Sequence, residues 1–526
     1  MNGRVERLLW WATLAWCVAL FWIAPRPAMV DLPQHAAQVA LLRDLLSGSS
    51  PWLAAFRINW LAPYLVGDMI ALALTLLMPV AAALKLALSL AYCAFIAALV
   101  ALRRHFDADA RLDWRLLLPF FGYAFAWGLF PFLISAPVAI CLILALDRYC
   151  LRPSSGRGAI TALLALVLLS SHGLTFIFCM AVAGCLYTAR MRTPAAWLRH
   201  LWPLLLPGLA AIASFIISTR LQQQFGGIDS VGPLVWNLGW KRIPKLLLYS
   251  LGSDPEPALI PAMLVLPLLP WMLGLRVARE RLHAGVLLAV TLLVSLTVPV
   301  SVMGTGLVYT RFALFVLPGY ALLFAARAAA PVESGAGGHG MLTLRRPTAG
   351  QRMAVACAVP LAVVVTWIVL GMHTVHAVRF AREAADFEPI LAAMAPAQRA
   401  ISLSFSPQSD SAGNSMAYLH FASWYQAEKH GWVDFNFAWF PEQIVRFQSA
   451  YLPAIGYNFD HAPASFDWQK HQAQSYRYFV VRHDSALPAS LFAGADCAPV
   501  VRLVSGAWTL FEQGHCKIGT PPGRAP

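Results

Sequence analysis

Charged residues are scarce in this sequence. Only 12% of its 526 residues are Asp, Glu, Lys or Arg, and 59% are hydrophobic, whereas a soluble globular protein is about 25% charged. The chain is therefore predicted to be an integral, α-helical, polytopic membrane protein. The net charge of +14 does not indicate a nucleic-acid partner, because the basic residues are scattered over short loops between apolar runs.

Several catalytic signatures are also missing. The sequence has no Walker-type phosphate loop, no dinucleotide-binding glycine fingerprint, no HExxH and no GxSxG, which argues against an ATP-driven pump and a zinc protease. None of the nine Cys shows a CxxC or a Cys/His metal spacing. Cys497 and Cys516 are the two in the polar C-terminal region, and a disulfide between them is predicted if that region lies outside the cytoplasm.

Eleven apolar runs predict the membrane spans, each of which needs about 20 residues. The first run follows Arg4 and Arg7, but Pro25-Arg26-Pro27 is a poor cleavage site, so this run is interpreted as a retained signal anchor. The runs are 8–24, 80–102, 115–130, 131–149, 159–171, 174–190, 201–219, 257–275, 284–302, 309–327 and 354–371.

The distribution of Lys and Arg predicts how these spans are oriented. The loops on the N-terminal side carry 19 of them and the loops on the other side carry 8. This bias predicts a bacterial-type inner-membrane protein with a cytoplasmic N-terminus and a periplasmic C-terminus. Residues 60–78 are also apolar, but a span there would put Arg103 and Arg104 outside. They are therefore predicted to form an interfacial or re-entrant helix in the first external loop, 25–79.

The chain is predicted to divide into a transmembrane domain, 1–371, and an external domain, 372–526. A Gly-rich flexible cytoplasmic linker is expected at 329–352. After residue 371 the sequence becomes mixed polar and aromatic, which indicates a small α/β domain. Its expected elements are a helix at 387–395 and strands at 478–481 and 508–511.

The segment Asp31-Leu32-Pro33-Gln34-His35, in the first external loop, holds the candidate catalytic residues. Pro33 suits the first turn of a helix, so Asp31 precedes a helix N-terminus, where the helix dipole favours a carboxylate. One interpretation is a simple cap. The other is a general base or a metal-anchoring carboxylate, positioned by His35 about one turn later.

A basic cluster occupies the longest external loop, 220–256. Lys241, Arg242 and Lys245 alternate there with aromatic residues, which suits the phosphate of a lipid carrier at headgroup depth. The alternative is an aromatic belt with cations that extend towards the lipid headgroups.

Two further polar residues lie at the external ends of spans. Arg311 has no acidic neighbour in sequence, and such a charge usually faces a cavity or a partner. A phosphate or diphosphate would suit it, and a structural pairing with Asp68 or Asp254 is the alternative. His172, between two spans, is expected to face outward, either as a hydrogen-bonded turn residue or as part of the site.

The C-terminal region has a short group of His and aromatic residues. His420, Trp424, Tyr425 and His430 lie within eleven positions of one another. They fit either a surface that contacts carbohydrate or the packing of an aromatic core.

These features together resemble the GT-C superfamily of polytopic membrane glycosyltransferases, which use polyprenyl-phosphate sugars. The similar features are the acidic motif in the first external loop, the interfacial helices after it, Arg103-Arg104 at the end of a long span, the turn Ser171-His172-Gly173 and an external C-terminal domain. The resemblance covers residues 1–371 at the level of layout.

The resemblance implies sugar transfer from a polyprenyl-phosphate donor at the external face, with Asp31 as the base that deprotonates the acceptor. Many members have two adjacent acidic residues at this position, whereas Leu32 follows Asp31 here. Dependence on a divalent cation therefore stays open.

The leading hypothesis is a single-displacement, inverting transfer to a lipid or glycan acceptor of the envelope. Asp31 would activate the acceptor and His35 would orient Asp31, while Lys241, Arg242 and Arg311 would hold the departing polyprenyl phosphate. The second hypothesis is a transporter or flippase of a lipid-linked saccharide, which would need charged or broken helices near the bilayer midplane. The third is a non-enzymatic scaffold whose external domain binds envelope proteins.

Overall fold

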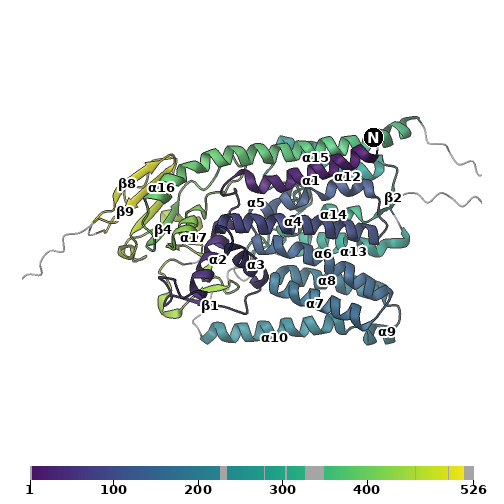
Figure 1. Ribbon diagram of the computed structural model, residues 1–526, viewed down its shortest axis with the longest axis horizontal. Helices are drawn as coiled ribbons and strands as arrows, with labels where there is room; N and C mark the ends of the chain where they lie inside the picture. Colours follow the sequence, from purple (N-terminus) through teal and green to yellow (C-terminus); the bar gives the residue numbers. More distant parts are fainter. Residues whose placement is uncertain are drawn as a thin grey trace, which may run out of the picture.

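The computed structural model describes residues 3–224, 234–277, 279–302, 305–325, 349–456, 458–495 and 497–514. It is a bundle of long helices with a small α/β region at one end (Figure 1). Six of the described helices are long and apolar enough to cross a membrane. They are α1 (Gly3–Ile23), α4 (Val80–His105), α6 (Phe130–Leu151), α8 (Gly173–Arg190), α10 (Trp202–Gln224) and α15 (Ala349–Glu383).

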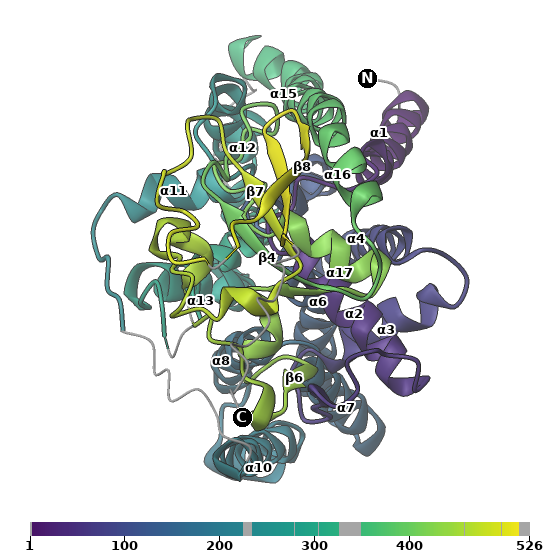
Figure 2. The same cartoon turned by 90° about the vertical axis from the view of Figure 1, so that its left-hand side faces the viewer.

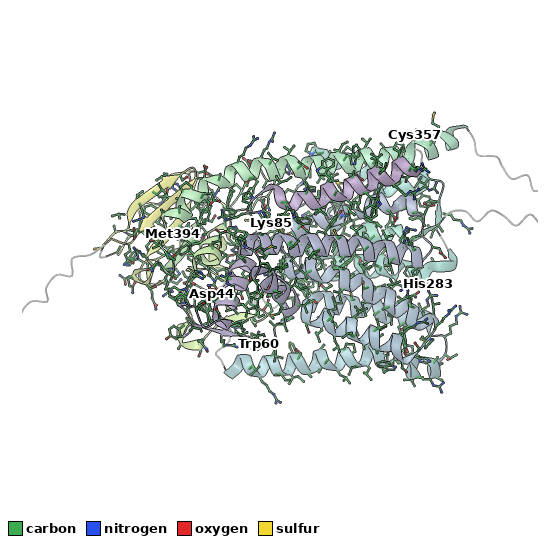
Figure 3. The ribbon with its side chains drawn as sticks, in the orientation of Figure 1. Asp44, Trp60, Lys85, His283, Cys357 and Met394 are labelled. Atoms are coloured by element: carbon green, nitrogen blue, oxygen red, sulfur yellow. The ribbon has the colours of Figure 1, made fainter. Side chains whose placement is uncertain are left out.

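Shorter apolar helices complete the bundle. They are α3 (Leu65–Thr75), α7 (Ser155–Ser171), α12 (Ile260–Met272) and α13 (Val286–Thr297). With 11 residues, α3 is about 16 Å long at 1.5 Å per residue, too short to cross a hydrocarbon core. Trp60 lies towards the α/β end of the molecule and His283 at the opposite end (Figure 3).

The apolar run 115–130 does not form one continuous helix, so the expectation of a regular helix there is wrong. It is divided into the 3-10 helices η1 (Ala110–Leu116) and η2 (Pro119–Phe121) and the single turn α5 (Tyr123–Ala126). Within this segment Gly122 allows another part of the backbone to approach closely, because a Cβ there would lie 2.3 Å from the Tyr249 carbonyl oxygen. Apolar composition alone cannot show such a contact.

This irregular segment still connects the two ends of the bundle. At the start of the segment, the Asp109 N–H donates to the Phe324 carbonyl, 3.2 Å away. At its end, the Trp127 carbonyl accepts from the Asp31 N–H, 3.0 Å away. Residues 114 and 116–121 between these ends are buried, which is the condition under which irregular backbone is tolerated at membrane depth.

The run 309–327 is also broken into short pieces. These are η5 (Thr310–Phe315), α14 (Val316–Ala321) and β3 (Phe324–Ala325), which pairs antiparallel with β2 (Arg276–Val277). The eleven-span layout therefore stays a prediction. The N-terminus and β2 lie at the end of the bundle away from the α/β region (Figure 1).

The α/β region is built on a five-stranded sheet in the order β5-β4-β7-β9-β8. Strand β4 is parallel to both β5 and β7, whereas β9 is antiparallel to the central strand β7 and to β8. The strands are β4 (Arg399–Ser404), β5 (Trp432–Asp434), β7 (Tyr478–Arg482), β8 (Val500–Ser505) and β9 (Trp508–Glu512).

The elements expected from the sequence are present in this region. The strands at 478–481 and 508–511 are β7 and β9, and the helix at 387–395 is α16 (Phe387–Ala393). Helix α15 continues without a break to Glu383, across the expected domain boundary at residue 371, and this boundary stays a prediction. The change in composition at that position therefore lies within one helix.

The first loop is fastened to the α/β region. In it, α2 (Leu32–Leu46) packs beside α17 (Trp424–Lys429), and β1 (Phe56–Ile58) pairs antiparallel with β6 (Val445–Phe447) (Figure 2). The buried Gln34 amide donates to the Phe435 carbonyl and accepts from the Phe437 N–H, both at 3.0 Å. The segment that carries Asp31 is thus held by the C-terminal part of the chain.

Cys497 is disulfide-bonded. Its expected partner, Cys516, lies outside the described residues, so the pairing stays a prediction. The expected linker 329–352 also lies outside them, except for 349–352, which begin α15.

Candidate active site

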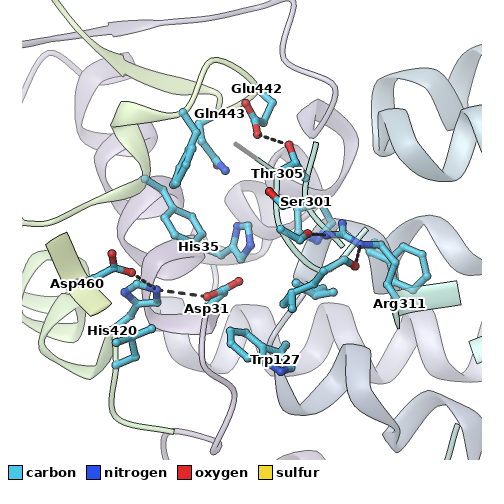
Figure 4. Close-up of a pocket in the computed structure, with 18 of the residues that line it drawn as sticks. Asp31, His35, Trp127, Ser301, Thr305, Arg311, His420, Glu442, Gln443 and Asp460 are labelled. Atoms are coloured by element: carbon cyan, nitrogen blue, oxygen red, sulfur yellow. Dashed lines mark hydrogen bonds and ion pairs between the residues drawn. The ribbon is translucent and has the colours of Figure 1, made fainter. Parts of the chain in front are cut away.

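A cavity of about 590 Å³ lies where the first loop, the end of the helical bundle and the α/β region meet (Figure 4). Aromatic and apolar side chains such as Trp127, Phe132 and Phe437 form much of its wall. Its charged and titratable lining residues are Asp31, His35, Tyr64, His172, Arg311, His420, Glu442, Asp460 and His461.

The backbone fixes the position of Asp31. The residue is at the N-cap of α2, yet its side chain makes no capping hydrogen bond, so the interpretation as a simple cap is not supported. Its N–H donates to the Trp127 carbonyl, 3.0 Å away. The next residue, Gly128, has a φ of +70°, and a Cβ there would lie 2.8 Å from the Leu32 nitrogen. A glycine is required for this close approach, and it lets the 127–128 turn support the Asp31 backbone.

The Asp31 carboxylate contacts a histidine from the α/β region. His420 Nε2 lies 3.4 Å from Asp31 Oδ1 and 3.7 Å from Asp460 Oδ2, as the dashed lines in Figure 4 show. Burial raises the pKa of Asp31 well above its ordinary value; the Asp460 charge adds to this increase and Arg311 opposes it. Burial lowers the pKa of His420 to about 4. The His420 imidazole is therefore neutral at neutral pH, and the raised pKa makes the Asp31 carboxylate, when ionised, a stronger base than an ordinary Asp, as suits general-base chemistry.

His35 lines the same cavity but does not have the expected role. Its ring packs edge-on against Phe437, with the centroids 5.6 Å apart, and its Nδ1 has no hydrogen-bond partner among the described residues. Burial lowers its pKa to about 3. In the described part of the chain, the histidine in contact with the Asp31 carboxylate is His420, so the orientation of Asp31 by His35 is not seen.

Arg311 is positioned by the backbone before it. Its Nε donates to the Leu307 carbonyl at 3.1 Å and its Nη2 to the Gly306 carbonyl at 2.8 Å. Its Nη1 lies 3.3 Å from His172 Nε2. These contacts hold the guanidinium at the cavity wall, where it provides the positive charge that a phosphate group requires.

The alternative pairing of Arg311 with a carboxylate is not observed. Among the described residues, the buried Asp68 carboxylate on α3 has no hydrogen-bond partner. Asp254 lines a separate, smaller cavity of about 80 Å³. Neither residue lines the cavity that contains Asp31 and Arg311.

His172 fits both interpretations that its sequence position allows. It caps α8, because its Nδ1 accepts from the Thr175 N–H at 3.1 Å. Its ring also stacks on Tyr64, with the centroids 5.3 Å apart, while Nε2 faces Arg311. The turn between α7 and α8 thus helps to build the cavity wall.

The basic cluster lies outside this cavity. Lys241, Arg242 and Lys245 line a separate pocket of about 310 Å³ beside α11 (Arg242–Tyr249). Arg242 is 3% exposed; its guanidinium donates to three backbone carbonyls and lies 4.0 Å from the Tyr309 ring centroid. The two lysines are exposed. The structure therefore does not bring these three residues to Asp31, and Arg242 joins the segment at Asn237 to the C-terminal end of α13.

Three lining residues from the α/β region were not identified as site residues from the sequence. Glu442 accepts a hydrogen bond from Thr305 Oγ1 at 3.4 Å, and burial raises its pKa. Asp460 and His461 belong to the 3-10 turn η10 (Phe459–His461). They lie in irregular segments more than 400 positions after Asp31, and no spacing in the sequence indicates that they meet it.

The expected divalent cation has no evident ligand set. Within the described residues, no group of three or more His, Cys, Asp or Glu side chains is arranged to hold a metal ion. Metal dependence therefore stays an open expectation.

Known proteins were compared with the chain by sequence and by structure. Neither protein-family models nor curated protein sequences match it. The structure is similar to that of ArnT from Cupriavidus metallidurans bound to undecaprenyl phosphate, with a TM-score of 0.56 and 12% identity over 99% of this chain and 100% of that one. It is also similar to the same protein in the apo state, with a TM-score of 0.55 and 14% identity over 97% and 98%.

At these identities the similarity shows the fold and not the activity. It extends over nearly the whole chain, so it includes the helical bundle and the α/β region together. The chain therefore shares the fold of ArnT, in agreement with the resemblance that its sequence features indicated.

Proposed function

We propose that the protein is a glycosyltransferase that uses a polyprenyl-phosphate-linked sugar as its donor. The observation that carries this proposal is the convergence of the Asp31 carboxylate and the Arg311 guanidinium on one cavity at the end of the bundle. A base for the acceptor and a cation for the leaving group are the two groups that such a transfer needs.

The reaction that fits this arrangement is a single displacement. A hydroxyl or amine of the acceptor attacks the anomeric carbon and gives its proton to Asp31. The bond from the anomeric carbon to the phosphate oxygen breaks, and the polyprenyl phosphate leaves with the electron pair. Arg311 stabilises the charge that develops on this phosphate. Because phosphate is a good leaving group, no covalent enzyme intermediate is needed, and the anomeric configuration inverts.

We place the reaction at the external face of an inner membrane. The connecting segments 152–157 and 190–199, at the other end of the bundle, carry Arg residues at helix ends and in short turns, and segments rich in Arg usually stay in the cytoplasm. With this orientation the cavity and the α/β region are periplasmic. The acceptor is then a lipid or glycan of the cell envelope. ArnT, which shares the fold, has been solved with undecaprenyl phosphate bound.

The proposal is tested by the release of undecaprenyl phosphate, which every sugar donor would yield. The purified protein in lipid nanodiscs is incubated with undecaprenyl-phosphate-linked hexoses and pentoses and a membrane-lipid extract as acceptor. We expect Asp31→Asn to lower the rate about 100-fold or more, the usual contribution of a general base. The matched control is Asp484→Asn, at an exposed carboxylate of the α/β region, which should keep the rate.

Two results would contradict the proposal. If the Asp31→Asn protein had the rate of the wild type, Asp31 would not be the base. Movement of a labelled lipid-linked sugar across a liposome membrane without cleavage of its phosphate bond would favour a transporter.

A further inference from the structure

We infer that His420 and Asp460, both from the α/β region, complete the base by forming a proton relay from Asp31 to solvent. This inference rests on the proposed transfer reaction and deepens it. It gives the α/β region a direct part in the chemistry of a cavity whose base lies in the first loop.

The relay is a line of three side chains from two distant parts of the chain. A single nitrogen, His420 Nε2, lies 3.4 Å from Asp31 Oδ1 and 3.7 Å from Asp460 Oδ2. His420 is 5% exposed, and its ring packs edge-on against Phe437 with the centroids 5.5 Å apart. This packing holds the imidazole between the two carboxylates.

His420 and Asp460 also form a partition between two cavities. On one side is the large cavity with Asp31. On the other is a polar pocket of about 10 Å³, which both residues also line, and which is about the size that one water molecule needs. Its other polar lining residues are Gln34, Ser402, Ser404 and Ser423. The Ser404 hydroxyl has no hydrogen-bond partner among the described residues, so it is available to such a water.

The relay continues from this partition to the surface. His461 Nε2 lies 3.6 Å from Asp460 Oδ2, and the His461 side chain is 40% exposed. A proton that reaches Asp460 thus has a titratable neighbour in contact with solvent. His461 therefore marks the exit of the relay.

The proton balance of the relay is simple. The acceptor proton moves to the Asp31 carboxylate as the new glycosidic bond forms. It passes to the lone pair of His420 Nε2 against the lowered pKa of this imidazole, so the imidazolium forms only briefly, between carboxylates that stabilise its positive charge. Asp460 and His461 then release the proton to water. Asp31 returns to its ionised form for the next turnover.

The charges around His420 predict how pH affects the relay. The groups that face it are Asp31, Asp460, His461 and His35, with Arg311 across the cavity. Because the Asp460 charge helps to raise the pKa of Asp31, removal of that charge should lower this pKa. The acidic limb of the kcat profile then shifts to lower pH in Asp460→Asn.

The test measures undecaprenyl phosphate release by full-length His420 variants. We expect His420→Gln, which keeps a hydrogen-bond donor but accepts no proton at this position, to lower kcat at least about 10-fold without a change in KM. In His420→Ala, added imidazole should restore most of the lost kcat, because the base can enter the space that the side chain leaves. A purely structural histidine would show no such rescue.

The matched control is His430→Asn. His430 also pairs with a carboxylate of the first loop, because its Nδ1 lies 2.5 Å from Asp44 Oδ2, but it lies outside the cavity. Its φ of +56° is one that Asn tolerates. This variant should keep the kcat and the pH profile of the wild type.

The outcomes separate the relay from the proposed function. The relay is overturned if His420→Gln keeps the wild-type kcat, or if His420→Ala is inactive with and without imidazole although it melts at the wild-type temperature. The relay is also overturned if the acidic limb of the kcat profile lies at the same pH in Asp460→Asn as in the wild type. In each case an inactive Asp31→Asn protein would still support the proposed function. An active Asp31→Asn protein would contradict both the relay and the proposed function.

Discussion

The turn at Gly128 offers a test of how the backbone positions Asp31. Gly128 has a φ of +70°, and a Cβ on it would lie 2.8 Å from the Leu32 nitrogen and 2.9 Å from the Asp31 nitrogen. Both distances are shorter than any normal contact, so Gly128→Ala must move the turn, α2 or both. The left-handed conformation alone costs a residue with a Cβ about 1–2 kcal/mol.

The larger effect should fall on activity, because the turn that must move also accepts the Asp31 N–H hydrogen bond. A displacement of about 1 Å in a catalytic group lowers rates about 100-fold, so we expect a fall of that order in kcat/KM. The assay is undecaprenyl phosphate release, with thermal melting to check the fold. Gly184→Ala is the matched control, because its Cβ would meet no atom within 4 Å. If the two variants had kcat/KM values within about twofold of each other, the reasoning would be refuted.

Two further predictions concern the same cavity. Because burial and Asp460 raise the pKa of Asp31 and its ionised form is the base, kcat should fall as pH decreases through this raised pKa; a profile that stayed flat down to the ordinary Asp value of about 3.9 would contradict the assignment. Gln34→Ala removes two hydrogen bonds to the α/β region and leaves buried backbone groups unpaired, so the free energy of unfolding should fall by about 1–3 kcal/mol. Chemical denaturation measures this change, and an unchanged transition midpoint would show that the contact contributes nothing.

The sequence was sufficient for the class of protein and for part of the site. Apolar runs and the distribution of basic residues predict that the segments with Asp31, His172 and Arg311 lie on one side of the membrane, and the structure brings the three residues to one cavity. Long apolar runs are a strong indication of a membrane protein, because each must span the hydrocarbon core of the bilayer. Likewise, the buried strands β7 and β9 follow from their apolar and aromatic composition.

The remaining features depend on tertiary packing. The run 115–130 has the composition of a span, but it forms short turns, one of which packs through Gly122 against the 249–250 backbone. Hydropathy measures only the preference for an apolar environment and carries no information on such contacts. For the same reason it could not place the end of α15 at Glu383.

The basic cluster shows the corresponding limit for side chains. Lys241, Arg242 and Lys245 are close in sequence, but Arg242 turns inward to backbone carbonyls while the lysines stay exposed. The Arg242 guanidinium donates to carbonyls at the C-terminal end of α13, Ser295 and Val298, which no local pattern relates to residue 242. His420 and Asp460 reach Asp31 in a similar way, through packing of the α/β region on the first loop.

The most direct test of the central claim is a cryo-electron microscopy structure of the protein in nanodiscs with undecaprenyl phosphate. We predict the phosphate in the cavity between Asp31 and the α/β region, with an oxygen within about 3.5 Å of the Arg311 guanidinium. A phosphate bound instead by Lys241 and Lys245 in the neighbouring pocket, with the Arg311 cavity unoccupied, would contradict the claim.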